Sequence, residues 1–444
     1  MSELRRELGL SGAVFMGLGS IVGTGLFVSL GIAAGVAGNW ILLALPLAAL
    51  LALANGLSSA QLAAAHPVSG GTYEYGYRLL GPALGFTAGW TFLLAKSASA
   101  ATAALGFAGY LLLLGEFEAT TPARIGVGAA VTVAVTVLVL GGIRRSNLAN
   151  LLIVGITLLA LGAFVAVGLP GAIEALAGEN ARGIGTGPTT EPGSQAAGGG
   201  EALAWGPLFH ATALLFVAYT GYGRIATLGE EVREPRRTIP RAIWVTLWTV
   251  ALLYFAVALV ALGTLGAQRF GRATAETAAP LQLVAETLNV PLIPALVGIA
   301  AVTAMLGVLL NLVLGLSRVA LAMGRRGDLP RRVAGIHAAT GSPRPAVLLT
   351  GGVILGLVLL GDVRTTWSFA AFTVLVYYGI TNLAALRLPS RARLYPRWVA
   401  VAGLLGCLFL AFQVEVRIWG VGLAALAVGL LWHRTRREAR SLAE

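Results

Sequence analysis

The sequence is poor in charge. Only 11% of its 444 residues are charged and 57% are hydrophobic, whereas a soluble chain carries about 25% charged residues. The mean hydropathy of +0.83 points the same way. These values exclude a soluble globular enzyme, a disordered chain and a coiled coil. They predict one polytopic membrane domain rather than the two or three soluble domains that the length would allow.

Residues that build chemical sites are also scarce. The single cysteine, Cys407, excludes an internal disulfide and a cysteine-based metal site. The four histidines lie far apart and match no ligand spacing. No nucleophile–base pair is apparent, and the glycine-rich stretch 19–25 is not followed by the Gly-Lys-Ser/Thr of a phosphate-binding loop. We therefore predict a protein that is not an enzyme and that uses no metal or cofactor.

Long apolar runs are abundant. A helix needs about 20 mainly apolar residues to cross a bilayer, and the sequence predicts an all-α integral membrane protein with twelve transmembrane helices. The Gly-, Pro-, Ser- and Thr-rich segment 170–205 is expected to be a flexible extracellular loop, and 265–290 could form a short external helix. The expected spans are 10–36, 41–65, 84–114, 122–141, 147–169, 206–229, 240–264, 291–322, 344–360, 367–387, 397–414 and 416–433.

The basic residues are distributed unequally between the connections. If the N-terminus is cytoplasmic, 22 of the 31 Lys and Arg residues fall on the inside and six on the outside. The positive-inside rule then places both termini in the cytoplasm and supports an even number of spans. The net charge of +12 is thus explained by topology in the cytoplasmic membrane. The lipid bilayer is the expected partner, and nucleic acid is not.

Two of the expected spans contain interruptions. Four glycines, Gly17, Gly19, Gly23 and Gly25, occupy nine residues of the first span, at a cost of about 1 kcal/mol each in a helix. Such a stretch either packs closely through small-xxx-small spacing or unwinds beside a cavity. In the sixth span, two glycines flank Tyr222.

Paired interruptions in corresponding spans are typical of inverted-repeat transporters. We therefore expect a single transporter domain over 1–444. Its repeats would be 1–170, with spans 1–5, and 206–390, with spans 6–10. Two extra C-terminal helices would follow in 397–433.

An unwound helix favours a zwitterion as substrate. Free N–H groups at the start of a half-helix attract an anion, and free carbonyl groups at the end of another attract a cation. No Asp or Glu lies in the core of an expected span, so backbone carbonyls would have to hold an ammonium group. This favours α-amino acids over polyamines or metal ions.

Three motifs carry a family resemblance. Residues 19–27 read GSIVGTGLF, and Phe216, Ala218, Tyr219 and Gly221 precede GEEVREPRRTIPRAI at 229–243. A third match is SRVALAM at 317–323 followed by GDLP at 327–330. In this order the motifs resemble those of the amino acid–polyamine–organocation permeases. The resemblance implies secondary-active transport by alternating access in a LeuT-like 5+5 inverted repeat, with helices 1 and 6 broken.

The resemblance also implies a substrate site. The substrate carboxylate would meet backbone amides of the first span, and its amino group would meet carbonyls of the first and sixth spans. Phe216 would be a gate over the substrate, although it could be an ordinary packing aromatic, and Thr24 could be an ordinary helical hydroxyl. The expected binding residues are Gly19, Ser20, Val22, Gly23, Thr24, Gly25, Phe216, Val217, Ala218, Tyr219 and Gly221.

Charged residues near the inner ends of spans form a second expected group. Glu230 and Glu231 would cap the sixth span or pair with nearby arginines. Arg318 and Asp328 are expected in an inner-gate or cytoplasmic network. Arg224 either pairs with a cytoplasmic carboxylate or shapes the pocket, where a cation would disfavour cationic substrates.

The coupling ion is the least determined feature. Many relatives carry a lysine in the fifth span, but 147–168 contain none, and Thr303 is the only candidate hydroxyl for a sodium site in the eighth span. The one lysine, Lys96, lies about 18 Å along the third span, with Ser97, Ser99 and Thr102 as expected neighbours. A charge at that depth is by default a functional hypothesis: a proton carrier, a fixed cation, or a side chain that snorkels or caps carbonyls.

We therefore predict a permease for neutral or small apolar amino acids with proton symport. The alternatives are an exchanger, a polyamine or organic-cation carrier, and an amino acid sensor that moves nothing.

Overall fold

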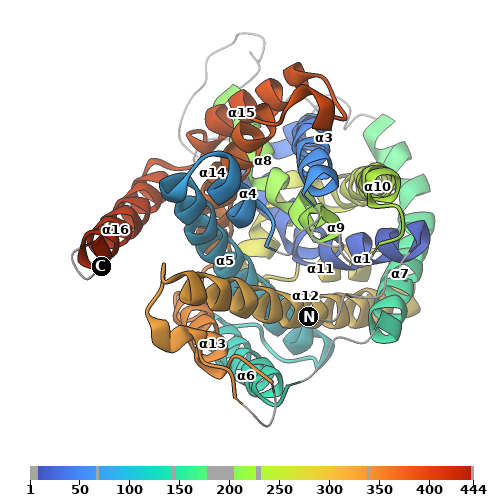
Figure 1. The fold of residues 1–444 in the computed structure, drawn as a ribbon. Coiled ribbons are helices and arrows are strands. Elements are labelled where there is room, and N and C mark those ends of the chain that lie inside the picture. Colours follow the sequence, from blue (N-terminus) through green and yellow to red (C-terminus); the bar gives the residue numbers. More distant parts are fainter. Residues whose placement is uncertain are drawn as a thin grey trace.

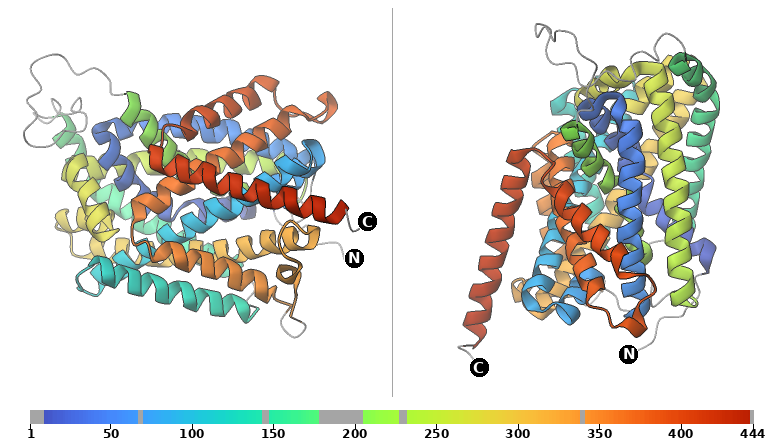
Figure 2. Two further views of the ribbon diagram at one scale, coloured as in Figure 1. Left: turned by 90° about the vertical axis from the view of Figure 1, so that its left-hand side faces the viewer. Right: turned by 90° about the horizontal axis from the view of Figure 1, so that it is seen from above.

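The structure is a computed structural model. It describes residues 9–66, 70–142, 147–177, 205–226, 232–337 and 341–441, with no side-chain detail at 147–149 and 437–441. Every regular element in these residues is a helix. The long helices run roughly along one direction and form one bundle (Figure 1, Figure 2). The expected all-α class is confirmed.

The elements follow the apolar runs closely. In chain order they are α1 (Leu10–Ile21), η1 (Gly25–Ser29), α2 (Leu30–Ala37), η2 (Gly38–Trp40), α3 (Ile41–Ala65), α4 (Thr72–Leu79), α5 (Pro82–Leu114), α6 (Thr121–Leu140), α7 (Asn147–Ala177), α8 (Trp205–Tyr219), η4 (Thr220–Tyr222), α9 (Gly223–Ala226), α10 (Pro235–Thr277), α11 (Pro280–Thr287), α12 (Leu292–Arg326), η5 (Arg331–Ala334), α13 (Arg344–Val358), α14 (Val363–Leu386), η6 (Ser390–Ala392), α15 (Arg397–Ala411) and α16 (Val416–Ser441).

Eight stretches of the described chain are long and apolar enough to cross a membrane, among them α5, α12 and α14. Three shorter apolar helices, α1, α13 and α15, accompany them. These lengths and compositions are those of a helical membrane protein. The number of twelve spans stays a prediction.

Both expected interruptions are present. α1 ends at Ile21, Val22 has an extended backbone (φ −77°, ψ 100°), and a π-helical turn over Gly25–Ser29 leads into α2. In the second stretch, α8 ends at Tyr219 and a 3₁₀ turn over Thr220–Tyr222 leads into α9.

The connections contain more helix than the sequence indicated. α7 continues to Ala177, so the first residues of the segment expected to be a loop from 170 are helical; Pro170 is accommodated within the helix, and the Ala, Leu and Glu that follow favour it. α10 continues past a kink at Gly266 (φ 73°, ψ 157°) to Thr277, and α11 follows it. The external helix expected in 265–290 is therefore found as two pieces.

α5 occupies the centre of the bundle. It packs against α12, α14, α4, α6, α13 and α16, and it is the most enclosed of the candidate spans. α16 stands at the edge, where α5 and α14 are its main neighbours (Figure 1, Figure 2). The two broken stretches lie side by side, because α2 and η1 both pack on α8.

Candidate functional site

The two helix breaks are in direct contact. A Cβ atom on Gly221 would collide with the carbonyl oxygen of Ser20, which is backbone and cannot swing aside. A Cβ on Gly25 would lie 2.8 Å from the Cα of Ala218. Only glycine lets the broken helices approach this closely.

The packing alternative for the first-span glycines also holds. A Cβ on Gly23 would lie 2.6 Å from Val308 Cγ2 of α12, and one on Gly19 would lie 2.5 Å from Asn150 Oδ1 of α7. The same glycine-rich run therefore packs against neighbouring helices and is interrupted between them. The two interpretations of the motif describe one structure.

Polar groups without partners face the first break. Val22 N–H donates to Leu18 O (2.7 Å), but the described residues provide no recorded acceptor for the N–H groups of Gly23, Thr24 and Gly25. The Thr24 hydroxyl is 3% exposed and likewise has no partner among the described groups. These donors stand at the start of the helical run Gly25–Ala37, where the helix dipole is positive. The arrangement favours an anion.

Tyrosine hydroxyls meet the carbonyl groups at the breaks. The buried Tyr254 hydroxyl of α10 lies 3.1 Å from Ile21 O and 3.2 Å from Ala218 O, so it connects the ends of α1 and α8. The Tyr378 hydroxyl of α14 donates to Thr220 O at 3.1 Å. Each carbonyl oxygen has two lone pairs, so these bonds leave acceptor capacity at the break.

Lys96 reaches the second break. Its Nζ donates to Thr220 Oγ1 at 3.1 Å, and the Thr220 hydroxyl donates to Val217 O at 2.8 Å. Two of the hydroxyls expected near Lys96 have other recorded bonds: Ser99 donates to Ala95 O of its own helix, and Thr102 bonds Ala98 O and Thr366. The lysine thus contacts the broken helix rather than the hydroxyls of its own helix.

Aromatic side chains enclose the second break. Phe216, Tyr219 and Tyr222 are fully buried. The Phe216 ring meets Tyr378 edge-to-face, with 5.6 Å between centroids. This position suits a gate and a packing aromatic equally well. Val217 and Ala218 are also buried in this layer, and Ser20 donates to Met16 O at 2.8 Å.

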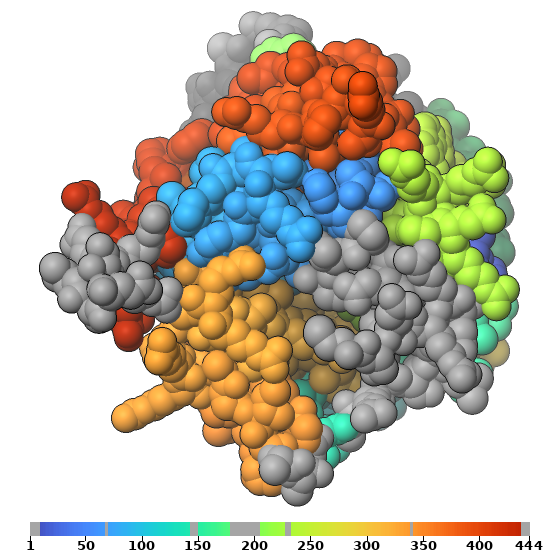
Figure 3. All heavy atoms as spheres, viewed as in Figure 1, coloured from blue at the N-terminus to red at the C-terminus, as the bar shows by residue number. Residues whose placement is uncertain are grey.

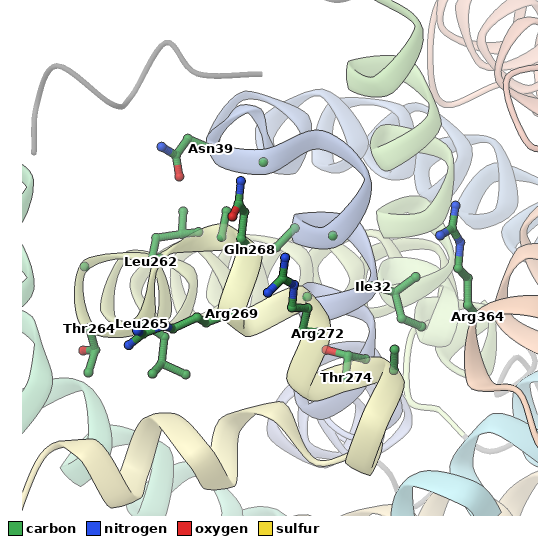
Figure 4. Close-up of a pocket in the computed structure, with 18 of the residues that line it drawn as sticks. Ile32, Asn39, Leu262, Thr264, Leu265, Gln268, Arg269, Arg272, Thr274 and Arg364 are labelled. Carbon is green, nitrogen blue, oxygen red and sulfur yellow. The ribbon is translucent and has the colours of Figure 1, made fainter. Parts of the chain in front are cut away.

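A cavity of about 780 Å³ lies beside α2, the helix that follows the first break (Figure 4). It is bounded by α2, the end of α7 and the kinked part of α10, and Arg269 and Arg272 line it. Tyr110 of α5 donates to Phe27 O at 2.9 Å and accepts from Leu281 N–H at 3.1 Å. One hydroxyl therefore connects α11 to the turn that follows the first break.

A polar cluster closes the opposite end of the bundle. Asp328, which is 4% exposed, accepts from the hydroxyls of Tyr73 and Tyr77 of α4 at 2.7 Å each. His433 Nδ1 lies 3.4 Å from Asp328 Oδ1. Arg326 pairs with Glu74 at 2.9 Å and covers both tyrosine rings. We call these residues the Asp328 cluster; in Figure 3 the α4 side chains lie beside the segment after α12.

Burial and the hydrogen bond to Asp328 raise the pKa of the Tyr73 phenol above its usual value near 10. The Tyr73 hydroxyl therefore remains a donor over the physiological range. The cluster joins α4, α12 and α16, three elements that are far apart in the sequence.

The other expected network residues are placed differently. Arg318 is exposed on α12, and it is Arg326 that joins the Asp328 cluster. Arg224 is half-buried in α9. Glu230 and Glu231 lie outside the described residues. Thr303 donates to Ile299 O and Ala300 O of its own helix.

Several contacting residues were missed. Tyr254, Tyr378 and Thr220 contact the breaks, and His433 completes the Asp328 cluster. A tyrosine in an apolar span is a usable signal, because a buried hydroxyl needs a partner. The identity of that partner depends on which helices are neighbours in the fold. The spacing of residues along the chain does not predict those neighbours.

Comparisons with known proteins identify the family of the chain. The family model described as "Amino acid permease" matches residues 12–433. An uncharacterised transporter of Mycobacterium tuberculosis (strain ATCC 25618 / H37Rv) is 41% identical over 98% of this chain and 92% of its own. A branched-chain amino acid permease of Bacillus subtilis (strain 168) is 28% identical over 93% and 89%. A methylthioribose transporter of that organism is 25% identical over 84% and 80%. The chain belongs to the amino acid permease family.

Proposed function

We propose that this permease carries a neutral apolar α-amino acid across the cytoplasmic membrane by alternating access. The observation that carries the proposal is the group of donors at the first break for which the described residues provide no recorded acceptor: the N–H groups of Gly23, Thr24 and Gly25 and the hydroxyl of Thr24. They are the chemistry that an α-carboxylate needs, and they are enclosed by protein.

The amino group of the substrate would be held by carbonyl oxygens across the same contact. Ile21 O and Ala218 O already converge on one hydroxyl, that of Tyr254. An ammonium group could take the second lone pair of such carbonyls. The substrate side chain would then lie against Phe216, which supports its role as a gate.

The charge around the break supports a neutral substrate. Lys96 is held against Thr220, and none of the candidate spans among the described residues is rich in Asp or Glu. A cationic side chain would meet repulsion from Lys96 and would find no carboxylate. The relative named as a branched-chain amino acid permease supports the same class, whereas the one named for methylthioribose makes a neutral compound of another kind the second candidate.

The proposed architecture has twelve spans with both termini in the cytoplasm. Spans 1–5 and 6–10 would form the two repeats, with α15 and α16 appended. The breaks in the first and sixth spans, five spans apart, support this arrangement. So does the distribution of arginine.

The proposed coupling is proton symport through Lys96. Its Nζ is bound to a hydroxyl at the break of the sixth span. Loss or gain of a proton there would alter a contact between α5 and the part of the chain that must move. Exchange without net proton movement is the alternative in the same fold.

Uptake into proteoliposomes tests the proposal. Labelled leucine, valine, alanine, arginine and methylthioribose would be compared with and without an inward proton gradient. We expect uptake of leucine, valine or alanine that the gradient stimulates and a protonophore abolishes, and no uptake of arginine. Uptake that requires amino acid inside the liposomes and does not respond to the proton gradient would indicate exchange instead of symport. Uptake of methylthioribose alone would overturn the amino acid assignment.

A further inference from the structure

A second cavity lies away from both helix breaks. Its volume is about 330 Å³, and it lies between α5, the segment after α12, α13 and α16. Leu94 and Ser97 of α5 form one wall, Leu349 and Val353 of α13 form another, and Trp432 of α16 lies across from them. The lining is almost entirely apolar. We call it the α13–α16 crevice.

The crevice opens on the outer surface of the bundle. Leu349, Val353 and Trp432 are 41%, 42% and 36% exposed, although each is a large apolar side chain. α16 stands apart from the bundle on this side (Figure 2). In a protein that spans a bilayer, such a surface faces the hydrocarbon chains of lipids.

Basic residues are neighbours in the chain of residues that line the crevice. Arg331 and Arg332 lie between Pro330 and Val333, which line it. The Arg436 guanidinium stacks on the Trp432 ring, 4.5 Å from its centroid. All three arginines are exposed, and the structure records no ion pair for them with a described acidic residue. The sequence places all three on the cytoplasmic side.

We propose that the α13–α16 crevice binds one anionic phospholipid, with an acyl chain along Leu94 and Val353 and the phosphate at Arg331, Arg332 and Arg436. An uncharged groove would accept any lipid tail. Three arginines next to its lining, which form no recorded ion pair with a described acidic residue, favour an anionic head group, because basic pockets between helices on the cytoplasmic side attract such lipids. This inference does not depend on what the permease transports.

The bound lipid would also touch the Asp328 cluster. Trp432, which lines the crevice, donates its Nε1–H to Asp328 O at 2.8 Å, and the next residue, His433, lies against the Asp328 carboxylate. A lipid that holds Trp432 in place therefore stabilises the attachment of α16 to α12. We expect the anionic lipid to raise the melting temperature of the detergent-solubilised protein.

Native mass spectrometry of the purified full chain tests head-group selection, with phosphatidylglycerol and phosphatidylcholine of identical acyl chains as probes. We expect one phosphatidylglycerol to be retained preferentially. Each arginine contributes about a fivefold factor in affinity, so the combined Arg331→Gln, Arg332→Gln and Arg436→Gln variant should lose about 100-fold. The control is the combined Arg236→Gln, Arg237→Gln and Arg241→Gln variant, which removes the same charge at the start of α10, across the bundle from α16 (Figure 1).

Two single variants test the position of the acyl chain. Leu349→Trp would fill the crevice and abolish retention, whereas Leu348→Trp, on an exposed neighbouring position of α13 outside the lining, would leave it unchanged. Equal retention of the two lipids by the wild type would overturn the proposal. So would full retention by the triple arginine variant, or equal behaviour of the two tryptophan variants. Lipid retention is measured only on tryptophan variants that purify as monodisperse protein. If Leu349→Trp does not fold, Val353→Phe is used in its place.

Discussion

Thr220 is the residue at which charge, backbone and aromatic contacts meet. Its hydroxyl accepts from Lys96 and donates to Val217 O, while its carbonyl accepts from Tyr378. Three helices, α5, α8 and α14, therefore converge on one turn. A change in the charge of Lys96 acts directly on the turn that joins α8 to α9.

Replacing Lys96 separates the two roles proposed for it. Lys96→Met removes the cation, and we expect uptake that no longer responds to a proton gradient. Lys96→Arg keeps a permanent positive charge, because arginine stays protonated at all relevant pH values. If the lysine is a fixed cation, Lys96→Arg retains gradient-stimulated uptake; if it is a proton carrier, Lys96→Arg loses it. Gradient-stimulated uptake unchanged in Lys96→Met would exclude both roles. The measurement is initial uptake rate in proteoliposomes at two internal pH values.

Tyr254 tests the contact between the breaks. Tyr254→Phe removes the single O–H donor that Ile21 O and Ala218 O share at the contact between the breaks. We expect a loss of about 1–3 kcal/mol in stability, seen as a lower melting temperature, together with slower uptake. Tyr395→Phe is the control, because no hydrogen bond is recorded for the half-exposed Tyr395 hydroxyl. Equal melting temperatures for the two variants would show that the Tyr254 contacts are not needed.

At the scale of the helices, the sequence predicted the breaks but not what they contact. Four glycines in the first span and two around Tyr222 are unfavourable in a continuous helix, so the interruptions could be located from composition alone. The sequence also indicated helix within 265–290 but ended α7 too early, because Pro170 and Gly171 indicate a helix end only when nothing packs beyond them. Contacts such as that of Gly221 with Ser20 depend on how two helices cross. The spacing of residues within either helix does not predict that crossing.

Gly221 provides the test of that crossing. Gly221→Ala places a Cβ against the carbonyl oxygen of Ser20, and the overpacking should cost about 1–3 kcal/mol and reduce uptake. Gly315→Ala in α12 is the matched control, since nothing lies within 4 Å of its added Cβ and alanine favours a helix. We expect its melting temperature to be equal to the wild type or higher. A Gly221→Ala variant as stable and active as Gly315→Ala would mean that the breaks do not need to touch.

At the scale of the whole molecule, the Asp328 cluster joins regions that are adjacent only in the fold. Tyr73 and Tyr77 come from the first repeat proposed, Asp328 and Arg326 from the second, and His433 from the last helix. The sequence singled out Asp328 through its motif and grouped Arg318 with it, whereas the recorded ion pair beside Asp328 is that of Arg326. From the sequence alone, Arg318 and Arg326 are equally plausible neighbours of Asp328. The choice between them is made by the position of α4 against the end of α12.

The two arginines therefore give the sharpest test of how the ends of the bundle are held together. Arg326→Gln removes the ion pair with Glu74 and the cation over Tyr73 and Tyr77. The pair is partly exposed, so we expect only about 1 kcal/mol, measured as a lower melting temperature, but a clear fall in uptake if α4 must stay attached to α12 during the transport cycle. Arg318→Gln removes the same charge from an exposed position of the same helix, and its melting temperature should stay within the error of the wild type. If Arg318→Gln slows uptake as much as Arg326→Gln does, the effect belongs to the positive charge at this end of α12 and not to the Asp328 cluster. A restored melting temperature in Arg326→Lys without restored uptake would separate the ion pair from the stacking on the two tyrosines.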